Sequence, residues 1–173
     1  MAGCLTLKPK AGDAKASQDL LRSKVYLAHN LWYNSSLIIP VENYHNGKII
    51  SAGTEVEIIE YDNTKIVFMD NSGNVYTMIY REDRTMLPVE KYIPTLFVKK
   101  NPLEDFDSET IALIKEGRAV KGMDRNVVFA SWGAPMRTRT PDMQNNNTWI
   151  YWADPEKYKR AIFKNGKLLE ILE

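Results

Sequence analysis

The last third of the chain constrains the fold most, because its strongest turn signal lies next to its strongest strand signals. Asn165 and Gly166 separate two β-prone runs, residues 159–164 and 167–172. An Asn-Gly pair in this setting is typical of a two-residue type I′ hairpin. Residues 149–152, Trp-Ile-Tyr-Trp, are aromatic and β-branched and indicate a third strand. We therefore expect a small antiparallel sheet at the C-terminal end.

Two short helices are predicted immediately before that sheet. Asp107 or Ser108 can cap a helix that runs to about Glu116. Asp124 can cap a second helix, and Gly133 can end it in a conformation with positive φ. A helix of about nine residues does not persist alone in water. We therefore expect the second helix to cover one face of the sheet.

Short β-prone runs fill residues 24–100, and turn-forming Asn, Ser and Gly residues separate them. Residues 55–61 alternate acidic and apolar side chains, which is typical of a half-buried antiparallel strand. The last run, residues 92–98, contains Pro94 and is predicted to be an edge strand. This spacing of short strands predicts a small antiparallel barrel of the SH3-like type.

The predicted fold class is α+β, in three parts. Residues 1–23 would hold a lipidation site and a flexible tether, because residues 8–17 contain almost nothing to bury. Residues 24–100 would form the SH3-like β domain. Residues 103–173 would form a module of two helices on a three-stranded antiparallel sheet.

The position of Cys4, the single cysteine, is informative. It follows Ala-Gly, the small-residue pattern that precedes the lipidated cysteine of bacterial lipoproteins. We predict that Cys4 carries a lipid anchor, and the alternative is a free cysteine without a role. One cysteine and two histidines disfavour a zinc site, and we expect no metal or cofactor.

The charge balance and hydropathy exclude several classes of protein. A formal net charge of +1 gives no electrostatic reason to expect a nucleic-acid partner. No apolar run is long enough to predict a membrane-spanning helix. No glycine-rich loop between a strand and a helix supports nucleotide binding.

We predict no catalytic residues in this chain. A nucleophilic triad needs a nucleophile, a base and an orienting acid that converge in space. His29 lies in an apparent strand and His45 in a polar turn, and neither is close in sequence to an activated nucleophile. A packing or surface role is therefore predicted for both histidines.

The aromatic and basic residues of the last third supply the candidate binding site. Trp132, Trp149 and Tyr151 are expected in the core, whereas Trp152 falls on the opposite face of its strand. An exposed tryptophan on an open sheet face can anchor a partner, and nearby arginines can bind an anionic group. The predicted partner-binding residues are Trp152, Arg137, Arg139 and Arg160.

A set of short motifs in the last third of the chain occurs in the same order as in a known family. The motifs are residues 114–117, Gly122-Met123, Val127, Trp132-Gly133-x-Pro135, Trp149 with Tyr151, and Phe163-x-Asn165-Gly166-Lys167. In this pattern residues 105–173 resemble the SmpA/OmlA (BamE-like) outer-membrane lipoprotein domain. The resemblance implies two helices packed on a three-stranded antiparallel sheet, with no catalytic residues. Members of the family are accessory parts of the machinery that inserts β-barrel proteins.

Three functional hypotheses follow from the sequence. The first is a non-catalytic lipoprotein, anchored to the outer membrane on its periplasmic side, that binds an envelope protein or peptidoglycan. The second is an enzyme or small-ligand binder with a site between the two domains. A deep cleft that holds His29 or His45 beside a perturbed carboxylate would favour it, and a contact without a pocket would count against it. The third is an enzyme inhibitor that binds through an exposed, concave aromatic sheet face.

Overall fold

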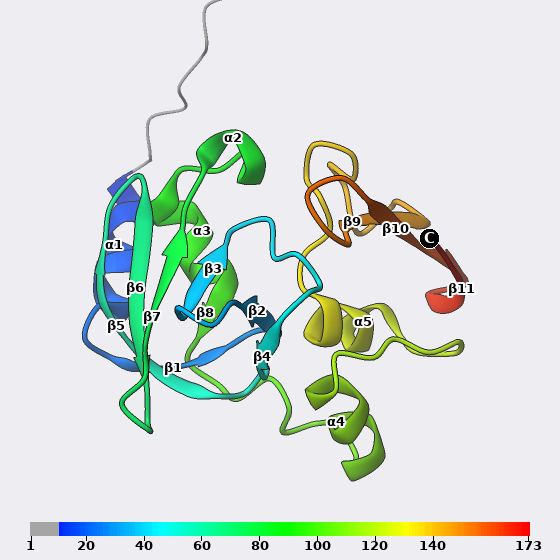
Figure 1. Cartoon of the computed structure of the whole chain (residues 1–173), viewed down its shortest axis with the longest axis horizontal. Helices are drawn as coiled ribbons and strands as arrows, with labels where there is room; N and C mark the ends of the chain where they lie inside the picture. The colour runs from blue at the N-terminus through cyan, green and yellow to red at the C-terminus, as the bar shows by residue number, and fades with distance from the viewer. Residues whose placement is uncertain (1–10) are drawn as a thin grey trace, which may run out of the picture.

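The computed structural model describes residues 11–173 as a mixed α+β structure with several sheets. Figure 1 shows the N-terminal half, coloured blue to green, on the left and the C-terminal half, yellow to red, on the right. The N-terminal half contains a six-stranded sheet in the order β3-β7-β6-β5-β1-β8. Its strands are β1 (Lys24–Leu27), β3 (Ile38–Pro40), β5 (Glu55–Tyr61), β6 (Lys65–Asp70), β7 (Val75–Ile79) and β8 (Phe97–Val98).

The six-stranded sheet and two helices enclose the first hydrophobic core. Strands β5 and β6 alternate buried and partly buried side chains, and Ile58 and Phe68 lie on the buried face. Helices α1 and α3 contact each other and add Leu20, Ile93 and Leu96 to the same core. The helices of this half are α1 (Ala11–Leu20), α2 (Glu82–Thr85) and α3 (Val89–Leu96).

The predicted closed antiparallel barrel is wrong. Among residues 11–173 the large sheet is open, and its edge strand β3 pairs with β7 in parallel. Three strands, β4 to β6, lie between β3 and β7 in sequence. Such a long connection can bring the chain back in the same direction, which a short hairpin turn cannot do.

The predicted edge strand over residues 92–98 is also wrong. Residues 92–98 are helical up to Leu96, and only β8 remains of the predicted edge strand. Val89, Ile93 and Leu96 form one buried helical stripe. The free energy gained by burying this stripe outweighs the cost of the backbone hydrogen bond that Pro94 cannot donate inside the helix.

Residues 11–20 form helix α1, although their composition predicts an unordered tether. Packing explains the difference, because Leu20 is buried and the Ser17 hydroxyl lies 2.9 Å from the Tyr61 hydroxyl. Tertiary contacts of this kind stabilise helices that are too short to persist alone. Cys4 lies outside the described residues, so its lipidation stays a prediction, as do the three predicted domain boundaries.

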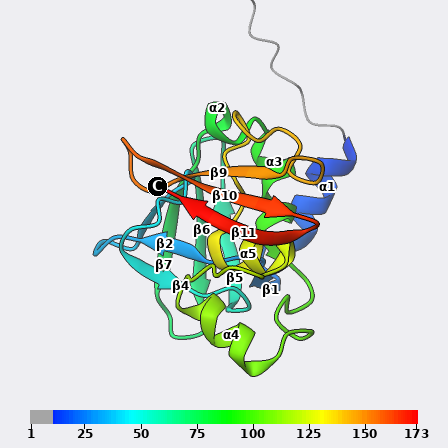
Figure 2. The same ribbon diagram turned by 90° about the vertical axis from the view of Figure 1, so that its right-hand side faces the viewer.

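The C-terminal half has two helices followed by a three-stranded antiparallel sheet in the order β11-β10-β9. Asn165 and Gly166 have positive φ, as a type I′ hairpin between β10 and β11 requires. Figure 2, in which this sheet faces the viewer, shows α5 behind it. The elements are α4 (Ser108–Lys115), α5 (Arg125–Trp132), β9 (Thr148–Trp152), β10 (Tyr158–Lys164) and β11 (Lys167–Leu172).

The two predicted helix caps differ in the structure. The Asp107 carboxylate accepts a hydrogen bond from the Thr110 backbone N–H at 2.9 Å, as a cap should. Asp124 occupies the N-cap position of α5 but makes no capping hydrogen bond there. Its carboxylate instead pairs with the Lys167 ammonium at 2.8 Å, which joins the start of α5 to β11.

The two halves share a second hydrophobic core. The core lies between α4, α5 and the three-stranded sheet, and it also contains Trp32 and Ala52 from the N-terminal half. Trp32 belongs to a small ladder of β2 (Leu31–Tyr33) and β4 (Lys48–Ile50). Gly117 allows the close approach, because a Cβ atom there would lie 2.9 Å from the Trp32 ring. Within residues 11–173, no helix has the length and apolar character needed to cross a membrane.

Candidate functional site

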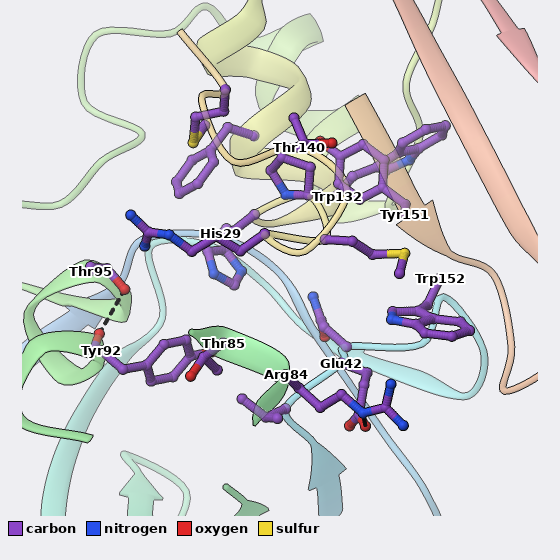
Figure 3. A pocket seen from close by; sticks show the side chains of 18 of the residues that line it. His29, Glu42, Arg84, Thr85, Tyr92, Thr95, Trp132, Thr140, Tyr151 and Trp152 are labelled. Carbon is purple, nitrogen blue, oxygen red and sulfur yellow. Dashed lines mark hydrogen bonds and ion pairs between the residues drawn. The ribbon is translucent and has the colours of Figure 1, made fainter. Parts of the chain in front are cut away.

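A cavity of about 250 Å³ lies between the two halves. Figure 3 shows Trp132, Thr140 and Tyr151 on one side of it and Tyr92, Thr95 and Glu42 on the other. Apolar side chains form most of the wall. They come from the loop after β3, from the segment between α2 and α3, from α5 and from the loop before β9: Val41, Leu87, Phe129, Trp132, Pro135, Met136 and Met143.

His45 lies in the wall of this cavity. Its Nε2 is 2.8 Å from the Trp132 carbonyl oxygen, and its ring lies 4.3 Å from the ring of Trp32 between centroids. Burial, and then the charge of Lys159, lower the pKa of His45 to about 3. The ring is therefore neutral near pH 7, and Nε2–H donates to the carbonyl. Nδ1 is left as a buried acceptor with no hydrogen-bond donor among the described residues.

Tyr151 also lies in the wall of the cavity, and it carries a hydrogen-bond donor that lacks an acceptor among the described residues. The side chain is only 2% exposed, and its hydroxyl has no hydrogen-bond partner within residues 11–173. Burial raises the pKa of Tyr151, so the hydroxyl keeps its proton. The rings of Tyr151 and His45 lie 5.5 Å apart between centroids. Two neighbouring side chains of the cavity wall thus carry a buried donor and a buried acceptor, and neither has a partner among residues 11–173.

His29 is the second histidine of the wall. Its Nδ1 is 2.9 Å from the Asn30 carbonyl oxygen, and the edge of Phe129 packs against its ring. Burial lowers the pKa of His29 to about 4, so this ring is neutral as well. In the described part of the chain neither histidine hydrogen-bonds a carboxylate, hydroxyl or thiol. The arrangement is suited to binding rather than to proton transfer by a triad.

The rim of the cavity is charged. The Glu42 side chain is 5% exposed, and its carboxylate lies 3.3 Å from Arg84 Nε and 3.5 Å from Arg81 Nη1. The Arg84 guanidinium also lies over the Trp152 ring, 5.8 Å from its centroid. Arg137 lines the same cavity and is exposed, which places it at the rim.

A fully paired polar network lies close to the cavity. Asn30 Nδ2 donates to the carbonyls of Ile114 and, at 2.9 Å, Ser131, both in the C-terminal half. Asn30 Oδ1 accepts from the Ala52 backbone N–H at 2.7 Å. Asn43, whose side chain lines the cavity, donates from Nδ2 to the Asn30 carbonyl at 3.0 Å. We call these contacts the Asn30 network. They fix the two halves against each other.

The structure brings together two of the four predicted partner-binding residues. Trp152 and Arg137 both line the cavity. Arg139 is exposed and stacks over Tyr158, with 4.6 Å between the guanidinium carbon and the ring centroid. Arg160 is exposed on β10 and does not line the cavity. Partner binding by these residues stays a prediction.

Sequence reasoning missed the two residues that define the cavity chemically. Tyr151 was expected in the core, and it is buried there, but the sequence does not show that its hydroxyl lacks a partner. His45 was expected in a polar turn, whereas its ring packs among three aromatic rings. Among residues 11–173, no cluster of His, Cys, Asp and Glu is suited to a metal ion.

Comparison with known proteins gives no match, whether to a family model, a curated protein or a solved structure. The resemblance to the BamE-like domain therefore stays a prediction, and the functional argument rests on the cavity.

Proposed function

We propose that this protein binds a small, mostly apolar molecule with a hydroxyl group in the cavity between its two halves. One observation carries the proposal: the side chains of Tyr151 and His45 line the same cavity, and the Tyr151 hydroxyl and His45 Nδ1 are buried without a partner among the described residues. A hydroxyl group can accept from the first and donate to the second. Each buried polar group left unpaired costs about 1–3 kcal/mol, so a ligand that pairs both gains affinity.

The size and lining of the cavity limit the ligand. An apolar cavity of about 150 Å³ holds benzene, so a cavity of about 250 Å³ holds about ten non-hydrogen atoms. The side chains of Phe129, Trp132 and Met136 in the wall favour an aromatic or compact aliphatic body. Neutral His29 and His45 without carboxylate partners support binding without catalysis.

Matched pairs of probes test this proposal. We would titrate the protein with 2-naphthol and naphthalene, and with 4-propylphenol and propylbenzene, and measure the dissociation constants by ligand-observed NMR. At least one hydroxylated probe should bind about tenfold more tightly than its hydrocarbon, because it pairs the buried groups. Tyr151→Phe should remove that preference.

Tyr76→Phe is the matched control. Tyr76 is also buried, but its hydroxyl donates to the Asp70 carboxylate at 3.1 Å in the six-stranded sheet. This variant should keep the preference for the hydroxylated probe. The proposal is refuted if no probe binds, or if wild-type protein binds both members of each pair equally well.

We also propose that the protein is an envelope lipoprotein that is anchored through Cys4 and binds an envelope protein or peptidoglycan. The order of α4, α5 and the sheet β11-β10-β9 supports this second proposal, because the BamE-like resemblance implies the same architecture. Metabolic labelling with a fatty-acid probe tests it. The precursor should incorporate the label in cells, and the Cys4→Ser variant should not. An unlabelled precursor that stays in the cytoplasm would contradict it.

A further inference from the structure

The charges at the rim of the cavity indicate a second feature of the ligand. Of the rim arginines, Arg84 is already neutralised, because Glu42 lies 3.3 Å and Asp83 lies 3.8 Å from its Nε atom. Arg137 differs, since it makes no ion pair, hydrogen bond or ring contact with any residue of the described chain. A guanidinium therefore lies at the mouth of the cavity with all its donors available to a ligand.

Arg137 and the unpaired buried groups mark two parts of one site. A hydroxyl group of the ligand, placed among the aromatic rings, would pair the unpaired groups of Tyr151 and His45. The guanidinium of an arginine matches the geometry of a carboxylate. Trp132 and Met136 supply apolar wall. A molecule that satisfies the whole site has a hydroxyl group inside, an apolar body and an acid group outside.

We propose, as an extension of the proposed function, that the ligand is a hydroxylated carboxylic acid whose carboxylate pairs with Arg137. Glu42 cannot take the place of that carboxylate, because Arg81 and Arg84 already hold it. The Glu42 carboxylate attracts a cationic group of a ligand only weakly, because Arg81 and Arg84 neutralise it. The selective element is therefore Arg137.

A probe with both groups tests the inference. We would compare 6-hydroxy-2-naphthoic acid with 2-naphthol, which lacks the carboxylate, by titration at low ionic strength. The acid should bind about three- to tenfold more tightly, a range set by one charge-assisted contact at an exposed site. The advantage should shrink as salt is added, because the contact is solvent-exposed.

Arg137→Gln should remove the advantage of the acid over 2-naphthol, measured as the ratio of the two dissociation constants in the same variant. Arg160→Gln is the matched control, because it removes the same charge from an exposed arginine that does not line the cavity. This control should keep the full advantage of the acid. Equal effects of the two substitutions would mean that net charge alone attracts the acid, and would overturn the inference.

The outcomes separate this inference from the proposed function. If wild-type protein binds 2-naphthol in preference to naphthalene but gains nothing from the carboxylate, the cavity is a hydroxyl site and the inference about Arg137 fails. If neither 2-naphthol nor the acid binds, both proposals fail. If wild-type protein binds 2-naphthol in preference to naphthalene, binds the acid more tightly still, and loses that further gain only in Arg137→Gln, both proposals are supported.

Discussion

The contact between the two halves has two regions that treat buried polar groups in opposite ways. In the Asn30 network, the side-chain amide of Asn30 donates to two carbonyls and accepts from a backbone N–H. In the cavity nearby, His45 Nδ1 and the Tyr151 hydroxyl are equally buried but have no partner in the described chain. Most buried polar groups in folded proteins are paired. An unpaired donor and acceptor beside an open volume therefore point to a ligand.

The Asn30 network and the cavity therefore differ in how much they contribute to stability. The Asn30 network joins Ala52 of the N-terminal half to Ile114 and Ser131 of the C-terminal half, so it determines how the halves are placed. In the cavity, the two unpaired groups contribute no hydrogen bond to stability, and the proposed ligand would pair them. Variants that disturb the network should destabilise the protein, and variants that remove an unpaired group from the cavity should not.

Among the substitutions, Asn30→Ala should have the largest effect on stability. It leaves the Ser131 carbonyl and the Ala52 backbone N–H buried without their partner, at about 1–3 kcal/mol each before relaxation, and it removes one of the two donors to the Ile114 carbonyl, which also accepts from the Gly117 backbone N–H. We expect the free energy of unfolding in urea to fall by about 4 kcal/mol. Asn46→Ala, at an exposed asparagine, should change it by less than about 0.5 kcal/mol. Similar losses in the two variants would mean that the network does not hold the halves together.

The two neutral histidines should make the stability of the protein depend on pH. Folding lowers the pKa of His29 to about 4 and that of His45 to about 3, from 6.5. Below pH 6.5 the unfolded chain therefore binds protons that the folded chain does not bind. Stability present above pH 6.5 is lost as the pH falls towards 4, by about 1.4 kcal/mol per pH unit for each histidine.

His45→Gln isolates the contribution of the cavity, because the glutamine amide can still donate a hydrogen bond but does not titrate. Urea unfolding of both proteins between pH 7 and pH 4 should give a slope that is smaller in the variant by up to about 1.4 kcal/mol per pH unit. Parallel curves would show that His45 is not held neutral in the folded protein.

Gly133→Ala should test the junction of the two regions. Gly133 has a φ of 84°, and a Cβ atom there would lie 2.9 Å from Asn43 Nδ2 and 3.0 Å from His29 Nδ1. Gly73→Ala is the control, because Gly73 has a φ of +83° but no neighbour within 4 Å. Both variants are strained, and we expect Gly133→Ala to cost about 2 kcal/mol more in urea unfolding. Equal losses of unfolding free energy in the two variants would mean that the side chains around Gly133 move to accommodate the added methyl group.

The predictions that the structure confirms are those that depend on neighbouring residues. Asn165 and Gly166 determine the β10–β11 turn through their own backbone preferences, and Asp107 caps α4 within three residues. The order of two helices and three strands in the C-terminal half follows from such local signals. The coarse α+β class could therefore be predicted from the sequence.

The wrong predictions concern elements that tertiary contacts decide. Residues 92–98 are β-prone as a run, but the helical stripe that buries Ile93 and Leu96 begins earlier, at Val89. The cavity has no local signature, because His45 and Tyr151 come from different halves of the chain. No pattern in either neighbourhood shows that these two groups are buried together and left unpaired.

The central claim is that the cavity contains a buried hydroxyl without a partner, and Tyr151→Phe tests it most directly. Removal of that hydroxyl should raise the free energy of unfolding of the ligand-free protein by about 1 kcal/mol. On folding, the hydroxyl loses its hydrogen bonds to water and gains none within the described chain. Tyr76→Phe, which removes a paired hydroxyl, should lower it by about 1 kcal/mol. Opposite signs for the same chemical change would support the account. A loss of stability in Tyr151→Phe as large as that in Tyr76→Phe would contradict it.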